Sequence, residues 1–334
     1  MALKILFIGG TGVISSACTA LCIAKGHQLY LLNRGRSFRP IPEDVISIKA
    51  DINDNSQIQS WLKDHSFDVI VDWIAYLPED VQRDFNLFKD KTAQYIFISS
   101  ASVYAKPPQL PIRETHPVNN PFWRYSENKI LCEEYLTSVN KKYGFPFTII
   151  RPSHTYDKTM IPLHGGYTNL KRLLTGKKII VHGDGTSLWT LTHHRDFARG
   201  FLGLLGKKEA VGEVYHITGD EILTWNEIAH ILAGAAGVEA NIIHLPSDFI
   251  AHFDAGWGPS LLGDKAYNLV FDNTKIKKIN PDYSATIPFA EGAEEIVNWY
   301  RRDDVPKSVD HSLDERMDEM ISRYESVFTR SEQL

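Results

Sequence analysis

The chain has 334 residues, 43% of them hydrophobic and 23% charged, with a formal net charge of −5. These values are typical of a soluble globular enzyme with one large domain or two fused ones. Lysines and arginines are dispersed along the chain, which argues against a nucleic-acid partner. No apolar stretch reaches the ~20 residues of a membrane span. Three cysteines are too few for a disulfide framework.

The first element is an apolar strand at 4–8 that leads into a glycine-rich loop and then a helix. This order cradles a pyrophosphate, because the N–H groups and the positive dipole end of the helix face the anion. Gly9 permits the tight turn, Gly12 lets the backbone approach the phosphates, and Ser15 stands where a third glycine is usual. The loop predicts a dinucleotide site at Gly9, Gly10, Thr11, Gly12, Val13 and Ile14. Since 1–10 already forms a core strand, we expect no signal peptide and a reducing cytoplasmic location.

Alternating strands and helices follow up to residue 153. Near-continuous apolar runs predict strands at 4–8, 28–33, 45–50, 67–75, 93–100 and 147–153. Helical patterns lie between them at 14–25, 55–64, 79–90 and 124–143. This rhythm predicts an α/β fold with a Rossmann-type doubly wound parallel sheet.

Beyond residue 153 the rhythm loosens. Apolar runs at 178–182 and 214–218 are expected to return as strands to the main sheet or its edge. Thr224 and Glu227 form a capping box, which predicts a helix from Thr224 to about Gly237. A short strand at 241–245 and a helix at 287–302 complete the pattern.

The elements predict a discontinuous domain organisation. We expect residues 1–157, with returning segments at about 178–219, to form the dinucleotide-binding domain. Residues 158–177 and 220–304 would form a smaller C-terminal α/β substrate domain. Residues 305–334 are a charged tail, expected to be helical in part.

A candidate catalytic set lies in the middle of the chain. The fifth predicted strand ends in Ser99-Ser100, and Tyr125 and Lys129 follow at i and i+4 on a predicted helix, facing the same side. An ammonium and an oxidised nicotinamide would both lower the pKa of Tyr125 toward neutrality. Tyr125 could then exchange a proton with a hydroxyl or carbonyl while Ser100 holds the same oxygen.

With these motifs the chain resembles the extended short-chain dehydrogenase/reductases, specifically the NAD(P)-dependent epimerase/dehydratase family, from residue 4 to about 302. The matching segments are the glycine loop, Ala50-Asp51-Ile52, Ser-Ser-x-x-Val-Tyr, Tyr-x-x-x-Lys, Arg151-Pro152 and Gly183-Asp184-Gly185. The resemblance implies that Ser100, Tyr125 and Lys129 are catalytic, that Asp51 and Ile52 flank the adenine, and that Ala75 lines the cofactor. Ser153 is a further expected cofactor contact. The resemblance also implies a homodimer through the helices at 79–90 and 124–143.

The choice between NAD and NADP is made near the end of the second strand. An acidic residue there accepts from the ribose 2′-hydroxyl of NAD, whereas an arginine binds the 2′-phosphate of NADP. This chain has Asn33 and Arg34, with no carboxylate until Glu43. The cofactor is therefore expected to be NAD(P), with NADP slightly favoured over NAD.

The substrate region departs from the family pattern. Relatives that act on nucleotide-diphosphate sugars carry an arginine where this chain has Trp189, and an indole cannot neutralise a diphosphate. The expected substrate-binding residues are Tyr76, Trp123, His154, His164 and Trp189. They favour a polyhydroxylated or aromatic small molecule with little charge. No histidine or carboxylate set has metal-ligand spacing, so no metal is expected.

Two classes of function remain open from the sequence. The first is a nicotinamide-dependent epimerase, dehydratase or carbonyl reductase. The second is a non-catalytic RNA-binding or cofactor-sensing role, because the Gly-Gly-Thr-Gly-x-Ile-Ser loop also resembles that of the chloroplast stem-loop RNA-binding proteins. The Ser100, Tyr125 and Lys129 set and the absence of a basic cluster favour the enzyme.

Overall fold

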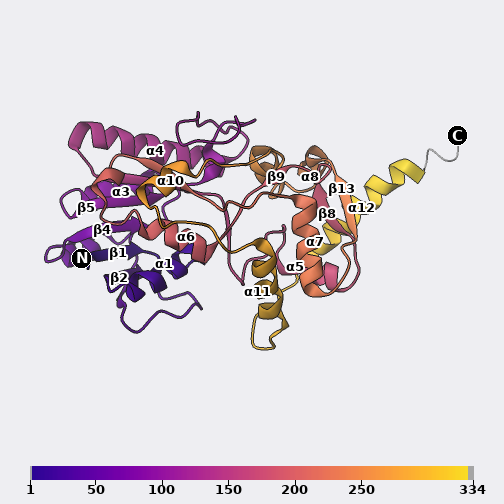
Figure 1. The fold of residues 1–334 in the computed structure, drawn as a ribbon, viewed down its shortest axis with the longest axis horizontal. Helices are drawn as coiled ribbons and strands as arrows, with labels where there is room; N and C mark the ends of the chain where they lie inside the picture. Colours follow the sequence, from indigo (N-terminus) through magenta and orange to yellow (C-terminus); the bar gives the residue numbers. More distant parts are fainter. Residues whose placement is uncertain (1, 330–334) are drawn as a thin grey trace.

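A computed structural model describes residues 2–329 and arranges the N-terminal part of the chain around one parallel sheet (Figure 1). Its seven strands lie in the order β11-β6-β5-β4-β1-β2-β3, and every neighbouring pair is parallel. The strands are β1 (Lys4–Ile8), β2 (Gln28–Asn33), β3 (Ile46–Lys49), β4 (Phe67–Asp72), β5 (Thr92–Ile98), β6 (Phe147–Pro152) and β11 (Val214–Ile217). The strand order reverses between β1 and β4, where open α/β sheets bind ligands beyond the strand ends.

Helices cover both faces of this sheet because its strands send alternate apolar side chains into two cores. Ile5 and Phe7 of β1 pack with α1 (Val13–Ala24) and α6 (His194–Leu202). Leu6 and Ile8 enter the opposite core. That core is formed with α2 (Asn55–Leu62), α3 (Pro78–Phe88) and α4 (Arg124–Tyr143). The predicted Rossmann-type doubly wound sheet is confirmed.

A second, smaller sheet lies at the other end of the molecule, where Figure 1 draws the later part of the chain. It pairs β8 (Ile179–His182) in parallel with β13 (Ile242–Leu245). Ile179 and Val181 pack on a core with α5 (Tyr167–Leu174), α7 (Trp225–Ala236) and α11 (Phe289–Arg301). Ile180 and Leu245 pack on the opposite side with α8 (Ser247–Phe253) and α12 (His311–Thr329).

Short elements connect the two sheets and build the walls of the sites described below. They are η1 (Ala101–Val103), β7 (His154–Tyr156), β9 (Leu188–Trp189), β10 (Leu191–His193), η2 (Lys208–Ala210), β12 (Leu223–Thr224), α9 (Gly258–Ser260), η3 (Leu261–Lys265) and α10 (Thr274–Ile279). Two further small pairings join β10 to β7 and β12 to β9.

The predicted elements agree with the structure in type, with one error of placement. The run at 214–218 does return to the main sheet as β11, beside β6. The run at 178–182 was expected in the same sheet and instead forms β8, beside β13. That part of the prediction is wrong, because an apolar run indicates a buried strand without specifying which strand pairs with it. The domain boundaries themselves stay a prediction.

The predicted C-terminal tail contains α12, whose apolar side packs on the smaller sheet. Residues 330–334 of that tail lie outside the described residues. None of the helices formed by residues 2–329 combines the length and apolar character that crossing a bilayer requires.

Candidate active site

The glycine loop turns sharply between β1 and α1. Gly9 and Gly10 have φ values of +95° and +98°, a region that side-chain-bearing residues rarely adopt. A Cβ on Gly10 would lie 2.5 Å from Leu31 Cδ1, so the loop needs glycine there for space as well. Ser15 replaces the usual third glycine, and its Oγ accepts the Gly12 N–H at 2.7 Å. The strand, turn and helix that the sequence predicts are therefore present.

A cavity of about 440 Å³ lies beyond the carboxyl ends of β1, β2 and β4. It is lined by several predicted cofactor residues, namely Gly9, Thr11, Asn33, Arg34, Asp51 and Ile52. Arg36, which follows Arg34 in the same loop, also lines it, as do Asp80 and Arg83, which the sequence reasoning missed. Tyr76, predicted as a substrate residue, lies on this wall too.

Asn33 shows how the cavity fits a dinucleotide. Its Oδ1 accepts the Gly35 N–H at 2.8 Å, which fixes the orientation of the amide. Its Nδ2 is buried and has no hydrogen-bond partner among the described residues. A buried donor without a partner is rare in folded proteins, so a ligand acceptor fits beside it. Together with the glycine cradle, this supports a dinucleotide in the cavity.

The predicted catalytic side chains lie together at the carboxyl end of β5. Lys129 of α4 is buried, and its Nζ donates to Ala75 O at 2.7 Å and to Ile98 O at 2.8 Å. The same ammonium lies 5.7 Å from the ring centroid of Tyr125. Ser100 Oγ lies 2.9 Å from Ser102 Oγ. These contacts bring Ser100, Tyr125 and Lys129 to one place.

The pKa values of this set differ from the sequence-based expectation. Burial raises the pKa of Tyr125 to about 12, and hydrogen bonding with Ser100 only partly opposes this. Burial also lowers the pKa of Lys129 to about 8. The sequence predicts a lowered Tyr125 pKa, but the chain's own side chains do not produce it, because desolvation raises the pKa by more than these side chains lower it. Tyr125 is thus a protonated acid near neutral pH.

A buried ion pair holds α4 against the sheet. Arg151 of β6 contacts Glu133 of α4 through two bonds, Nη2 to Oε2 at 2.5 Å and Nε to Oε1 at 2.9 Å. Ser99 also donates to Glu133 at 2.6 Å. Because Glu133 and Lys129 are one turn apart on α4, this pair sets the position of Lys129, the candidate catalytic lysine, relative to the strand end.

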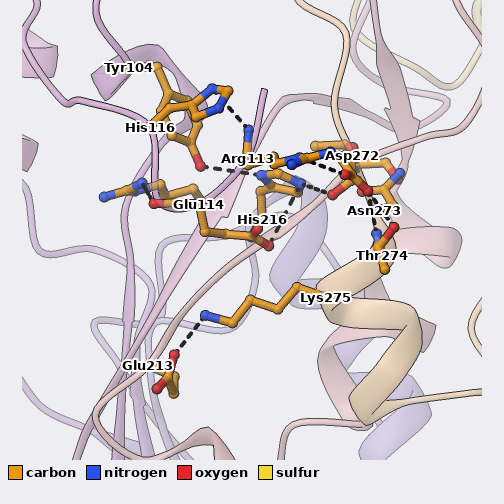
Figure 2. Close-up of polar contacts among 12 residues, drawn as sticks. Tyr104, Arg113, Glu114, His116, Glu213, His216, Asp272, Asn273, Thr274 and Lys275 are labelled. Atoms are coloured by element: carbon orange, nitrogen blue, oxygen red, sulfur yellow. Dashed lines mark hydrogen bonds and ion pairs between the residues drawn. The ribbon is translucent and has the colours of Figure 1, made fainter. Parts of the chain in front are cut away.

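Tyr104, the last residue of the Ser-Ser-x-x-Val-Tyr motif, has a structural role. Figure 2 shows its hydroxyl beside the His216 ring, with Nδ1 at 3.2 Å, and His216 Nε2 lies 2.9 Å from Asp272 O. The Glu114 carboxylate accepts the backbone N–H of His216 at 3.3 Å. Burial raises the pKa of Tyr104 and lowers that of His216. This buried cluster fixes the segment after β5 against β11.

The predicted substrate residues divide into two groups. Trp123 and Tyr76 lie beside the candidate acid, with ring centroids 4.9 Å and 6.0 Å from that of Tyr125. His154 and His164 line a second cavity, of about 200 Å³.

Trp189 does not line either cavity. It is 1% exposed, and its Nε1 donates to His154 Nδ1 at 3.2 Å, so it lies behind the cavity wall. Its predicted direct contact with substrate has no support in this geometry, because the β9 side chain is turned into the core. Ser153 likewise lines neither cavity and donates to Thr190 O at 3.0 Å.

The second cavity contains residues that sequence reasoning missed. Trp225, Trp257 and Lys265 lie in its wall beside His182. None belongs to a recognisable motif, and they come from segments that only the fold brings together. Within residues 2–329, no group of three or more histidine, cysteine, aspartate or glutamate side chains is placed to hold a metal ion.

Comparison with known proteins agrees with this geometry. Residues 5–218 match the model of the NAD dependent epimerase/dehydratase family. The chloroplast stem-loop binding protein of 41 kDa b from Arabidopsis thaliana is 31% identical over 262 residues, covering 74% of this chain and 67% of that protein. A putative UDP-glucose 4-epimerase from Methanocaldococcus jannaschii is 27% identical over 269 residues, covering 78% and 77%.

A solved structure shares the fold. The UDP-glucuronic acid 4-epimerase from Bacillus cereus, in complex with UDP-glucuronic acid and NAD, superposes with a TM-score of 0.73 at 22% identity. The superposition covers 89% of this chain and 99% of that one. Fold, glycine loop and family match agree, and the chain therefore belongs to the NAD-dependent epimerase/dehydratase family, as an enzyme of the extended short-chain dehydrogenase/reductase type.

Proposed function

We propose that this enzyme interconverts a hydroxyl and a carbonyl on a sugar-like substrate that carries no nucleotide diphosphate. The observation that carries the proposal is the meeting of Ser100, Tyr125 and Lys129 beside a dinucleotide-sized cavity. The nicotinamide supplies the hydride acceptor or donor when the cofactor is bound. An epimerase, a dehydratase and a net reductase all use this step.

The chain's own residues can transfer the proton to and from the substrate oxygen. Tyr125, protonated near neutral pH, donates to a substrate carbonyl oxygen in the reducing direction and takes the proton back in the other. Ser100 donates a hydrogen bond to the same oxygen, and its hydroxyl is oriented by Ser102, which in turn accepts from Ser126 at 2.7 Å. Lys129 has one N–H beyond its two carbonyl partners, and its charge stabilises a developing phenolate.

The cofactor proposed is NADP in preference to NAD. Asn33 offers an unpartnered N–H donor to the cavity, where an aspartate would repel a 2′-phosphate. Arg34 and Arg36 stand on the same wall and supply positive charge. The structural relative described above holds NAD, so the preference is specific to the residues of this chain.

The substrate proposal depends on Trp189. Its position in the family pattern calls for an arginine that grips a diphosphate, and here the side chain is an indole in the core. A diphosphate would lose that charge partner. The relatives named as UDP-sugar enzymes therefore share the fold and the reaction class proposed here. Their substrates carry a nucleotide diphosphate, which the substrate proposed for this chain lacks.

Tyr125→Phe tests the mechanism. Removing the hydroxyl should reduce turnover by about 10²- to 10⁴-fold, the usual contribution of a general acid, while NADP affinity stays within a few-fold. Turnover is followed by the absorbance of reduced nicotinamide over a panel of hexoses, hexuronates, hexose phosphates and UDP-glucose, and affinity by calorimetry. Tyr143→Phe, at the exposed end of the same helix, is the matched control. Near-normal rates in Tyr125→Phe would remove Tyr125 from the chemistry.

A second candidate function follows from the Arabidopsis thaliana relative, which is named as a stem-loop binding protein. Filter binding with a structured RNA tests it. Tight binding that weakens steeply with salt would favour this candidate, since phosphate contacts release counterions. A net charge of −5 favours the enzyme.

A homodimer through α3 and α4 and a cytoplasmic location stay predictions.

A further inference from the structure

The second cavity, of about 200 Å³, shares no lining residue with the cofactor cavity. Aliphatic side chains form part of its wall, and its polar and aromatic members are His154, His164, His182, Trp225, Trp257 and Lys265. His164 and Trp257 stack with ring centroids 4.2 Å apart and an interplanar angle of 7°. An apolar enclosure with a few polar groups is typical of a small-molecule site.

Lys265 brings a positive charge into this wall, where burial lowers its pKa and the charge of the adjacent Asp264 only partly opposes this. Among the described residues, its ammonium group is in no ion pair. The adjacent Asp264 pairs instead with Lys106, whose side chain is buried, at 3.3 Å. Two lysines therefore share one carboxylate, which leaves one positive charge in excess. Holding an unpaired charge away from water is costly, unless a ligand supplies its partner.

The imidazoles of the wall do not change this balance. Burial lowers the pKa of His154 to about 3 and those of His164 and His182 to about 4, and the Lys265 charge adds to the lowering in each case. All three rings are therefore neutral near neutral pH. Asp254 and Asp310 are the carboxylates that oppose this lowering at His164, and Asp254 is paired with Arg316 at 2.7 Å.

Trp225 adds a neutral donor to the same wall. Its side chain is 3% exposed, and its Nε1 has no hydrogen-bond partner among the described residues. A buried N–H normally finds an acceptor, so this one requires an explanation. Lys265 and Trp225 thus offer an ammonium and an indole N–H, and both can donate to oxygen.

We infer that this cavity holds an anionic oxygen group of the substrate, a carboxylate or a phosphate monoester, with Lys265 as its counter-charge and Trp225 as a second donor. The inference rests on the proposed function and replaces the substrate of little charge expected from the sequence. Lys265 Nζ lies 5.6 Å from the Trp123 ring centroid, and that ring neighbours Tyr125. Trp123 therefore connects the anion site to the candidate acid.

The charge balance also discriminates between anions. A single excess positive charge matches one carboxylate. A phosphate monoester carries about −1.5 to −2 charges near pH 7, so one ammonium balances it less completely. A nucleoside diphosphate would also bring at least two negative charges to a wall with one free ammonium. The charge balance therefore favours a carboxylated sugar over a nucleotide sugar.

Calorimetry on the full chain tests the inference with glucose, glucuronate, glucose 6-phosphate and UDP-glucose as probes. We expect glucuronate or glucose 6-phosphate to bind at least about tenfold more tightly than glucose, and the tighter of the two identifies the anion. Lys265→Met should abolish that difference, and Trp225→Phe should reduce it. Lys89→Met, an exposed lysine at the end of α3, is the control and should bind as wild type.

A thermal unfolding measurement separates a ligand site from a structural lysine. Lys265→Met removes a half-buried ammonium that is in no ion pair among the described residues, so the ligand-free variant should melt at a higher temperature than wild type. A lower melting temperature together with unchanged anion binding would overturn the inference, as would tightest binding of UDP-glucose. Tyr125→Phe should retain the anion preference while losing turnover. If wild type prefers the anionic sugar but oxidises none of the probes, the proposed chemistry fails and the anion site stands.

Discussion

Ser15 shows how one residue can replace a glycine in a phosphate loop. The third glycine of the usual pattern allows close packing between helix and strand. Here Ser15 is 2% exposed and uses its Oγ to accept the Gly12 N–H. The side chain thus occupies the first turn of α1 and satisfies a backbone donor that a glycine would leave to other partners. The loop keeps its shape because Gly9 and Gly10 carry the unusual backbone angles.

Asn33→Asp should reverse the cofactor preference. The carboxylate would still accept the Gly35 N–H, but it would replace the unpartnered donor with a negative charge on the cavity wall. We expect the ratio of NADP to NAD affinity to fall by about tenfold or more, a change of about 1.4 kcal/mol or more in relative binding free energy. Calorimetry with each cofactor measures the ratio.

The complementary variant Arg34→Ala removes positive charge from the same wall and should weaken NADP binding while leaving NAD binding within a few-fold. An unchanged ratio in Asn33→Asp would show that the 2′ position of the ribose lies elsewhere.

The proximity of the candidate catalytic residues was predictable because a local pattern brings them together; their catalytic roles stay a prediction. Tyr125 and Lys129 lie one helical turn apart, and Ser100 ends a neighbouring strand, so spacing and topology together predict the set. Lys265 and Trp225 carry no such pattern, because η3 and α7 come together only in the folded chain. Trp189 was expected to face the substrate, but the pairing of β9 with β12 turns it into the core.

At the scale of elements, α12 is the part of the fold with the least signal in the sequence. The sequence predicts a charged tail that is helical in part, without indicating its packing, and the structure buries Leu313, Met317 and Met320 against the smaller sheet. Leu313 Cδ2 would lie 2.4 Å from a Cβ on Gly165, so the helix packs directly on the segment before α5. Ile180, Leu261 and Trp257 belong to the same cluster and also line the second cavity. The helix therefore supports the wall of the anion site.

The Asp314→Asn and Asp318→Asn double variant should loosen this helix. Arg172 of α5 is 2% exposed and pairs with both carboxylates of α12. Without them it would be a buried charge held only by the backbone carbonyls of Lys178 and Asp314, and we expect the free energy of unfolding to fall by about 3 kcal/mol. Urea unfolding measures the loss.

Glu325→Gln removes the pairing between α12 and Lys178, whose side chain is much more exposed than that of Arg172. It should cost less than about 1 kcal/mol and serves as the control. Equal effects of the two variants would show that Arg172 does not anchor the helix.

At the scale of the whole molecule, each of the two sheets contributes the wall of a different cavity. The seven-stranded sheet forms the cofactor cavity, the smaller sheet and η3 form the anion site, and Trp123 and Tyr125 lie between. Buried imidazoles occur in both parts of the molecule: His154, His164 and His182 line the second cavity, whereas His193, His194 and His216 lie on β10, α6 and β11. The fold keeps these rings neutral by burial, and this gives the stability of the molecule a defined dependence on pH.

Acidification should destabilise the enzyme between about pH 6.5 and pH 4. Burial lowers the pKa values of His164, His182, His193 and His194 to about 4 and that of His154 to about 3. In this range the unfolded chain binds protons on these rings and the folded chain does not, so the free energy of unfolding falls as pH falls. Each ring contributes at most about 1.4 kcal/mol per pH unit.

Urea unfolding at several pH values, with matched histidine variants, tests this dependence. The Nδ1 of His194 is buried and has no hydrogen-bond partner among the described residues, so His194→Asn removes one titrating ring at little cost in hydrogen bonds. Its stability should therefore decline less steeply on acidification than that of wild type. His230→Asn, at an exposed position of α7, should leave the slope unchanged. A wild-type stability that stays constant from neutral pH down to about pH 4 would mean that the buried rings are protonated in the folded state as readily as in the unfolded chain.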